Sequence, residues 1–276
     1  PQGILCQVIV HADRSRDQSV TLKDKGKALE SNLFKNSFQL PLLENEEECV
    51  HPIERLSLGM HKSQEWDMVC RRQDLKEIFP LWFRLGQWLP RIEKPVFAAG
   101  TLRLLDECQE KIFRLAKNEL WECFFKLFKA GFYGLMVPRL KDEQFQGLVF
   151  DDELPSEGIP LSLLTEGSSL IRSLFIQESS NRLALLPCLL PQFHSGRFVN
   201  LSCFKEDMID IEWSKKVLRR VIWRSFSKKT VELVLQKDIK TFRVRRSMSE
   251  HGEILLRSAS LMMERGEILF LDRFQK

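Results

Sequence analysis

Several histidine, serine and cysteine side chains stand at spacings that call for a test of catalytic or metal-binding chemistry. His194 precedes Ser195, which places an imidazole beside a hydroxyl. Neighbouring side chains on an extended segment point to opposite faces, so this pair does not make a nucleophile and its base. Cys49, His51 and His61 lack the paired ligand spacing of structural zinc sites. No phosphate loop or glycine-rich dinucleotide fingerprint occurs, and we expect no metal and no cofactor.

A second patterned segment, residues 55–66, carries His61 and Trp66 among polar residues. Tryptophan offers a flat apolar face on which a sugar ring can stack, so the segment could face a carbohydrate. A tryptophan near helical spacing is also typical of a buried core. Both interpretations stay open, and His61 and Trp66 are candidate ligand-facing residues.

Basic residues are concentrated between residues 215 and 246, where only Glu232 and Asp238 oppose them. The basic residues are Lys215, Lys216, Arg219, Arg220, Arg224, Lys228, Lys229, Lys237, Lys240, Arg243, Arg245 and Arg246. Aromatic residues are interleaved with them, which is typical of a face that binds nucleic acid. A sheet with one cationic solvent face, whose lysines protect its edges, is the more economical interpretation. A polyanion or nucleic-acid partner is therefore the alternative.

The composition limits the class of protein. The 276 residues are 43% hydrophobic, which is enough for a buried core, and the net charge of +4 does not by itself require a polyanionic partner. No apolar run approaches the roughly 20 residues of a membrane-spanning helix, so we expect no membrane insertion. The seven cysteines include no Cys-x-x-Cys pair, and buried reduced thiols in a cytoplasmic protein are the interpretation we favour. The sequence does not define an oligomeric state.

Three regions differ in their hydrophobic periodicity, and together they predict an α+β fold. Residues 1–43 alternate like strands and predict the β-rich tail of an incomplete N-terminal domain. Residues 44–190 carry apolar residues at three- and four-residue spacing, from about 53 to 135 and again over 161–178, and predict helices. Residues 191–276 predict an antiparallel β-domain with a hairpin turn at 264–266.

The junction between the helical and β regions carries the most specific motif. Residues 185–213 read LLPCLLPQFHSGRFVNLSCFKEDMIDIEW. An apolar Leu-Leu-Pro turn precedes Ser195-Gly196. A strand of alternating apolar and polar residues then ends in Trp213, which lies on the same face as Ile209 and Ile211 and is therefore predicted to be buried. This junction resembles, without a gap, that of alpha-L-fucosidase-type glycoside hydrolases of family 95. There the last helix of an (α/α)6 barrel passes into a C-terminal β-domain. The matching residues are Gln177, Leu185, Leu186, Pro187, Leu189, Ser195, Gly196, Leu201, Asp210, Ile211, Glu212 and Trp213.

The same resemblance argues against catalytic activity in this chain. The family carries an Asp-Gly-Asn motif at the start of the helix that precedes the Leu-Leu-Pro turn. Without a gap, its catalytic aspartate falls on Ser162, and its glycine and asparagine fall on Leu163 and Leu164. A slip of three or four residues would bring Glu166-Gly167 to the motif, but a slip inside a helix rotates every later side chain off its face. We prefer the ungapped match.

The resemblance therefore implies a glycoside-hydrolase-like protein, with residues 44–190 as a partial (α/α)-barrel-like region, that has no catalytic residue in this segment. Carbohydrate is the partner class that it implies. The candidate ligand-facing residues are Glu166, Trp66 and His61. An inverting glycosidase also needs a carboxylic acid on the other side of the sugar, and we assign that role to no residue. The family's Arg-Gly-Gly segment is replaced by Cys-Phe-Lys-Glu at 203–206, so the ligand surface differs.

Overall fold

The structure is a computed structural model that describes residues 7–10, 20–24, 27–28, 53–59, 66–89, 99–138 and 161–276. The chain forms two compact units, residues 1–50 and residues 51–276. In the first unit, β1 (Gln7–Val10), β2 (Val20–Asp24) and β3 (Lys27–Ala28) form an antiparallel sheet in that order. The expectation of strands in this region is confirmed for the residues described.

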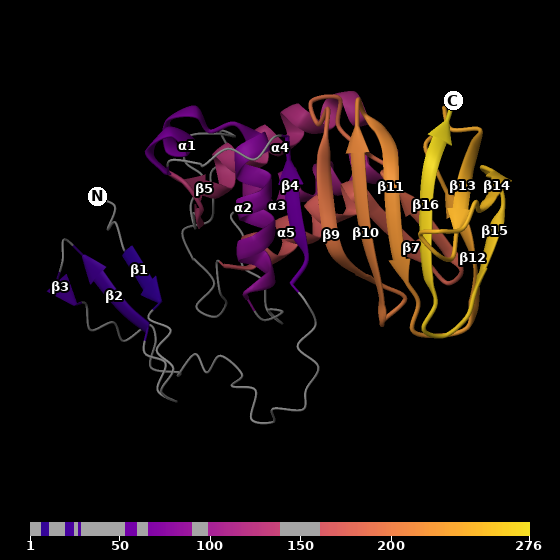
Figure 1. Ribbon diagram of the computed structural model, residues 1–276. Coiled ribbons are helices and arrows are strands. Elements are labelled where there is room, and N and C mark those ends of the chain that lie inside the picture. The colour runs from indigo at the N-terminus through magenta and orange to yellow at the C-terminus, as the bar shows by residue number, and fades with distance from the viewer. Residues whose placement is uncertain are drawn as a thin grey trace. The chain divides into compact units, whose positions relative to one another are not determined.

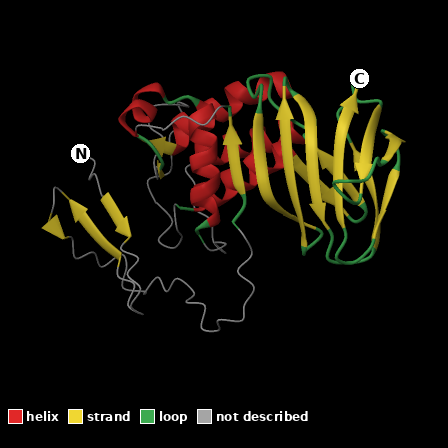
Figure 2. Ribbon diagram, in the orientation of Figure 1, coloured by secondary structure: helices red, strands yellow, loops and turns green. Residues whose placement is uncertain are grey.

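The second unit is mixed α+β, as the sequence predicts (Figures 1 and 2). Its described helices are α1 (Trp66–Arg72), α2 (Leu75–Gln87), α3 (Ala99–Phe113), α4 (Lys117–Gly131) and α5 (Ser162–Phe175). A short pair, β5 (Phe132–Tyr133) and β6 (Val137–Pro138), follows α4. Helix α2 packs on α5, and α3 packs on α4.

Two larger sheets complete this unit. The first is an antiparallel sheet of seven strands in the order β14-β13-β16-β11-β10-β9-β4. Its strands are β4 (Arg55–Leu58), β9 (Gly196–Cys203), β10 (Asp207–Ser214), β11 (Val217–Arg224), β13 (Thr241–Arg245), β14 (Glu253–Leu256) and β16 (Ile268–Gln275).

The second sheet has the order β15-β12-β8-β7. Its strands are β7 (Ile176–Ser179), β8 (Arg182–Leu185), β12 (Lys229–Val234) and β15 (Ser260–Met263). Strands β8 and β12 pair in parallel, while the other two pairings are antiparallel. The antiparallel expectation therefore holds for the seven-stranded sheet, and the smaller sheet is mixed.

Strand β10 shows why the period-two pattern specifies the large sheet. Its side chains alternate between buried and half-buried, so that Ile209, Ile211 and Trp213 face the core together. The expectation that Trp213 is buried is confirmed, since 1% of it is exposed. Its indole Nε1 donates a hydrogen bond to the carbonyl of Phe193 at 3.1 Å, which satisfies the one polar atom of the side chain.

Two segments that the periodicity assigns to helices are strands. Residues 55–58 form β4, which pairs with β9 and buries Leu56 opposite Phe198. In the four residues Arg-Leu-Ser-Leu, polar and apolar side chains alternate with period two. This short pattern is overlooked because the helical prediction covers the much longer range 53–135. Likewise, α5 ends at Phe175, and 176–179 become β7 because Ile176 adopts an extended backbone. Strands from 55–58 and 176–185 therefore join the sheets, and residues 51–276 form one unit without a boundary at 190.

The predicted hairpin at 264–266 is also wrong. The turn joins β15 of the four-stranded sheet to β16 of the seven-stranded sheet, so its flanking strands do not pair with each other. Gly266 has a φ of 79°, a left-handed backbone conformation that explains why a glycine occupies this turn. Alternation identifies a strand but not its partner, and here the partner lies elsewhere in the chain.

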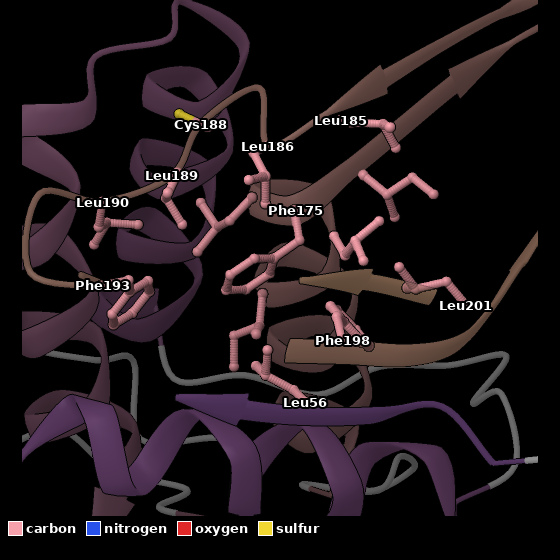
Figure 3. Close-up of a cluster of buried hydrophobic side chains, with 14 of the residues drawn as sticks. Leu56, Phe175, Leu185, Leu186, Cys188, Leu189, Leu190, Phe193, Phe198 and Leu201 are labelled. Atoms are coloured by element: carbon pink, nitrogen blue, oxygen red, sulfur yellow. The ribbon is translucent and has the colours of Figure 1, made fainter. Parts of the chain in front are cut away.

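The core is continuous from the helices to the sheets (Figure 3). At its centre the ring of Phe175, at the end of α5, lies 5.5 Å from that of Phe198 on β9 and 5.3 Å from that of Trp213 on β10. The Leu-Leu-Pro turn is fixed here, because the amide of Leu186 donates to the carbonyl of Phe175 at 2.8 Å. Leu185 and Leu186 are buried, as expected for the contact between helices and sheets.

Helices α2 and α5 approach each other closely through two glycines. A Cβ atom on Gly167 would overlap the indole of Trp82, and a Cβ atom on Gly86 would overlap the carbonyl of Leu164 and the side chain of Ser168. The absence of a side chain at both positions is therefore what allows this helix pair to pack.

We predict that Gly167→Ala destabilises the protein by roughly 1–3 kcal/mol, because forcing a methyl group into a filled site costs more than the helix propensity of alanine returns. Chemical unfolding measures the change. Ser169→Ala, on the exposed side of the same helix, is the control and should stay within about 0.5 kcal/mol of the parent. Equal stabilities of the two variants would show that the helices do not touch at Gly167.

Candidate functional site

Residue 162, where the predicted ungapped match would put a catalytic aspartate, is buried at the start of α5. Ser162 opens α5 and is 1% exposed. The next residue, Leu163, accepts a hydrogen bond at its carbonyl from Trp82 Nε1 at 3.2 Å. The Leu163 side chain lies where a Cβ atom on Gly131 of α4 would be. Trp82 of α2 and Gly131 of α4 therefore lie against the start of α5, and Ser162 brings a hydroxyl, not a carboxylate.

Glu166 lies on the solvent-facing side of α5, with Ser169, and its side chain is exposed. Its neighbour Gly167 faces the opposite way, against the indole of Trp82. The slipped alignment would explain Glu166-Gly167 as part of a catalytic motif. Packing against Trp82 accounts for the glycine without that motif.

The other two candidate residues are not brought to Glu166 by any described contact. Trp66 is the first residue of α1, and the position of its side chain lies outside what the structure describes. His61 lies outside the described residues altogether. Cys49 and His51 also lie outside them, so the sequence argument against a zinc site there is not tested.

The His194-Ser195 pair is part of a backbone turn. The amide of Lys216 donates to the carbonyl of His194 at 2.8 Å, and the amide of Gly59 donates to the carbonyl of Ser195 at 2.9 Å. The imidazole of His194 is exposed. The turn therefore ties β4 and the β10–β11 loop to the start of β9.

The most organised polar group is a cluster at the β9–β10 turn that sequence reasoning missed. We call it the hairpin cluster, and it comprises Glu178, Cys203, Phe204, Asp207, Trp223 and Lys229. Asp207 is fully buried. Its carboxylate accepts from Lys229 Nζ at 2.7 Å, from Trp223 Nε1 at 2.8 Å and from the amide of Phe226 at 2.9 Å.

Two stacked aromatic rings lie beside this ion pair. The ring of Phe204 stacks on that of Trp223 with centroids 6.1 Å apart, and Lys229 Nζ lies 5.3 Å from the Phe204 centroid. The amide of Phe204 donates to Glu178 at 2.7 Å. Burial raises the pKa of the Cys203 thiol, and the charges of Asp207 and Glu178 raise it further, so this thiol is neutral near pH 7.

One sequence signal could have identified the cluster. Asp207 has the same parity as Ile209, Ile211 and Trp213, so alternation puts a carboxylate on the buried face of β10. A buried carboxylate needs a cation and hydrogen-bond donors. What the sequence does not reveal is which lysine supplies the cation, because Lys229 comes from the second sheet.

A second polar contact, which we call the junction ion pair, joins Glu54 to Arg172. Arg172 Nε donates to Glu54 Oε2 at 3.0 Å, and the amide of Ser202 donates to Oε1 at 2.8 Å. The Arg172 guanidinium also donates to the carbonyl of Ser202. Gln87 of α2 donates to the carbonyl of Glu54 at 3.0 Å. The pair therefore connects the start of β4 with α2, α5 and β9.

Both groups serve to hold elements together. The carboxylates of Asp207 and Glu54 accept three hydrogen bonds or ion pairs each from the protein itself, and a general acid or base must instead reach a substrate. Among the described residues, no group of three or more histidine, cysteine and acidic side chains is placed to bind a metal ion. The arrangement is that of a structural network.

The basic segment 215–246 meets acids from neighbouring strands. The ion pairs are Arg220–Glu212 (2.7 Å), Arg224–Asp210 (3.2 Å), Lys228–Glu264 (2.8 Å), Arg243–Asp272 (2.7 Å), Arg245–Asp272 (2.7 Å) and Arg246–Glu267 (2.5 Å). These acids lie outside the segment in sequence, at 210–212 and 264–272. Strand pairing therefore neutralises much of the charge that the sequence concentrates.

A scan against protein-family models and a search of the curated proteins each find no match to this chain. None of the described helices is long and apolar enough to cross a membrane.

We predict that Asp207→Asn destabilises the protein by about 3–5 kcal/mol, because it leaves the Lys229 ammonium largely buried beside a neutral amide. Urea unfolding followed by tryptophan fluorescence measures this change. Asp238→Asn is the matched control, since Asp238 pairs with Lys276 at 3.0 Å on the surface. Its midpoint should equal that of the parent, and a similar loss in both variants would contradict a special role for the buried pair.

The stability that Asp272 contributes depends on pH. Hydrogen bonding from Arg243, with the charge of Arg245, holds the pKa of Asp272 below its usual range. A carboxylate whose pKa is lower in the folded state than in the unfolded state stabilises the folded protein. The full contribution is present when the pH is above the unfolded-state pKa of about 3.9, and it is lost as the pH falls through the folded-state pKa. The parent should therefore be more stable than Asp272→Asn at pH 7. The gap should shrink on acidification below about pH 4, as measured by thermal unfolding, and a constant gap would refute the assignment.

Proposed function

We propose that this chain is a glycoside-hydrolase-like protein of the alpha-L-fucosidase type that does not hydrolyse glycosides. In this proposal, helices α1–α5 derive from a reduced (α/α)-barrel-like region, and the sheets derive from the C-terminal β-domain. The protein serves as a binding or scaffolding unit, and carbohydrate is the ligand class.

The observation that carries the proposal is the environment of Ser162. Hydrolysis with inversion needs two carboxyl groups about 6.5–9.5 Å apart on either side of a sugar, with room for a water molecule. At Ser162 the side chain is a buried hydroxyl, between helices that leave little space around the start of α5. Glu166, the only carboxylate that a slipped alignment offers, is on the solvent-facing side of the same helix.

The polar network supports a scaffold in place of an active site. The junction ion pair holds β4 against α5 and β9, and the hairpin cluster replaces the segment where the family has Arg-Gly-Gly. In both the junction ion pair and the hairpin cluster, the carboxylate oxygens already accept hydrogen bonds from protein donors. The segment 203–206, where the proposed family has Arg-Gly-Gly, here belongs to contacts that stabilise the β9–β10 turn.

The alternative, a polyanion-binding face, has less support. Most of the arginines of 215–246 make ion pairs with acids of adjacent strands. A phosphate would have to displace those carboxylates. This competition lowers the gain from counterion release on which such binding depends.

The test is an assay of the purified chain with aryl α-L-fucosides and aryl galactosides. We expect no turnover above background, because general acid–base catalysis typically contributes 10²–10⁴-fold and the base is missing. Titration of the same sample with L-fucose and galactose, followed by NMR, reports carbohydrate binding separately from catalysis. Saturable shifts support a carbohydrate-binding unit, and their absence leaves a scaffold without this ligand.

The controls distinguish Glu166 from any other exposed acid. Glu166→Gln and Glu110→Gln, an exposed residue of α3, should both behave like the parent. Turnover that Glu166→Gln abolishes and Glu110→Gln preserves would overturn the proposal, and it would restore the slipped alignment with Glu166 as the base.

A further inference from the structure

Helices α3 and α4 form a hairpin in which two cysteines face each other. The connection 114–116 is short, and Leu115 has a φ of 56°, which turns the chain back on itself. Cys108 of α3 and Cys123 of α4 are both buried at the contact between the helices. They lie among buried leucine and isoleucine side chains, including Leu104 and Ile112.

The geometry of the two thiols is close to that of a bonded pair. Cys108 Sγ and Cys123 Sγ are 2.7 Å apart, and Cys123 Sγ lies 3.9 Å from the carbonyl oxygen of Leu104. A disulfide bond is about 2.05 Å long, so the sulfur atoms are within about 0.7 Å of bonding distance. Forming the bond therefore requires the two sulfur atoms to approach each other by about 0.7 Å.

We propose that Cys108 and Cys123 are a redox-active dithiol that forms an intramolecular disulfide by exchange with a small-molecule disulfide such as oxidised glutathione. The proposal is independent of the proposed function. It goes beyond the sequence-based interpretation of the cysteines as buried reduced thiols, because it assigns a reversible modification to one pair.

The exchange balances in two steps. The Cys123 thiolate attacks one sulfur of the oxidised glutathione, which forms a mixed disulfide and releases one glutathione thiolate. Cys108 then gives up its proton to solvent and attacks Cys123 Sγ, which forms the protein disulfide and expels the second glutathione thiolate. The two cysteines are oxidised by two electrons in all, and one glutathione disulfide is reduced to two thiols.

The surroundings fit this order of attack. The hydrogen bond from Cys108 lowers the pKa of Cys123, while the same hydrogen bond and burial raise that of Cys108. Lys111 favours both thiolates, and its ammonium is held by Glu107 at 2.5 Å. The Sγ–Sγ contact of 2.7 Å places either thiol to resolve a mixed disulfide on the other, and we assign the first attack to Cys123.

Access for the small molecule requires the hairpin to open, because both sulfur atoms are shielded from solvent. Oxidation should therefore be slow in the native protein and faster under conditions that loosen α3 and α4. Once formed, the disulfide closes a short loop and stabilises the hairpin, mainly by restricting the unfolded chain.

The test is incubation of the full chain with oxidised glutathione, followed by alkylation in denaturant and tryptic peptide mapping. Trypsin cleaves at Arg103, Lys111, Lys117 and Lys126, so the two cysteines fall in peptides 104–111 and 118–126. We expect these two peptides to be joined in the oxidised sample and separate after dithiothreitol. The midpoint of thermal unfolding should rise by about 5–10 °C on oxidation and return on reduction.

Cys188→Ser is the matched control, because Cys188 is equally buried and burial raises its pKa to about 11. This variant should oxidise like the parent, while Cys108→Ser and the double variant Cys108→Ala/Cys123→Ala should show no redox-dependent midpoint. Unlinked peptides in the oxidised parent would overturn the proposal, as would a midpoint shift that persists in Cys108→Ser. If the single variant does not fold, the peptide map of the parent decides the question.

Discussion

The end of helix α5 is the point on which the rest of this structure depends. The helix passes into β7 without a connecting loop, so one rigid segment belongs to both the helical layer and the second sheet. Phe175, its last helical residue, is in ring contact with Phe193, Phe198 and Trp213. The carbonyls of Leu174 and Phe175 accept from the amides of Cys188 and Leu186, which fixes the following turn against the helix. The apolar core is continuous because these aromatic side chains close the gap between helices and sheets.

Given this joint, the placement of polar groups follows from what burial demands. Elements that meet at an apolar joint also bring backbone groups and charged side chains out of water, and each must find a partner. The junction ion pair satisfies this for Glu54, Arg172 and the backbone of Ser202. The hairpin cluster does so for Asp207. Charged side chains whose hydrogen-bond partners all lie within the protein hold the elements rigidly together. A catalytic site instead needs groups that are held in place but still free to react with a substrate. This contrast is the physical basis for proposing a scaffold on a hydrolase-like fold.

The electrostatics of the large sheet illustrates the same dependence on tertiary partners. In sequence, 215–246 is a block of positive charge with two acids. In space, β11 lies between β10 and β16, and β13 lies beside β16, so Glu212, Asp210 and Asp272 are cross-strand neighbours of the arginines. The net charge of one sequence segment is therefore a poor guide to the charge of a sheet face, because neighbouring strands of the sheet come from other segments.

Local patterns were enough to determine the α+β class, the long alternating strands such as β10, and the burial of Trp213, because each depends on the period of a single element. The tertiary structure alone decided that 55–58 is an edge strand on β9, that the turn at 264–266 links two sheets, and that Lys229 neutralises Asp207. It also decided that Cys108 meets Cys123. Each of these facts is a contact between residues distant in sequence or on different elements. Such contacts are selected by the packing of the whole core, and periodicity within one segment carries no information about the partner that the other face will meet.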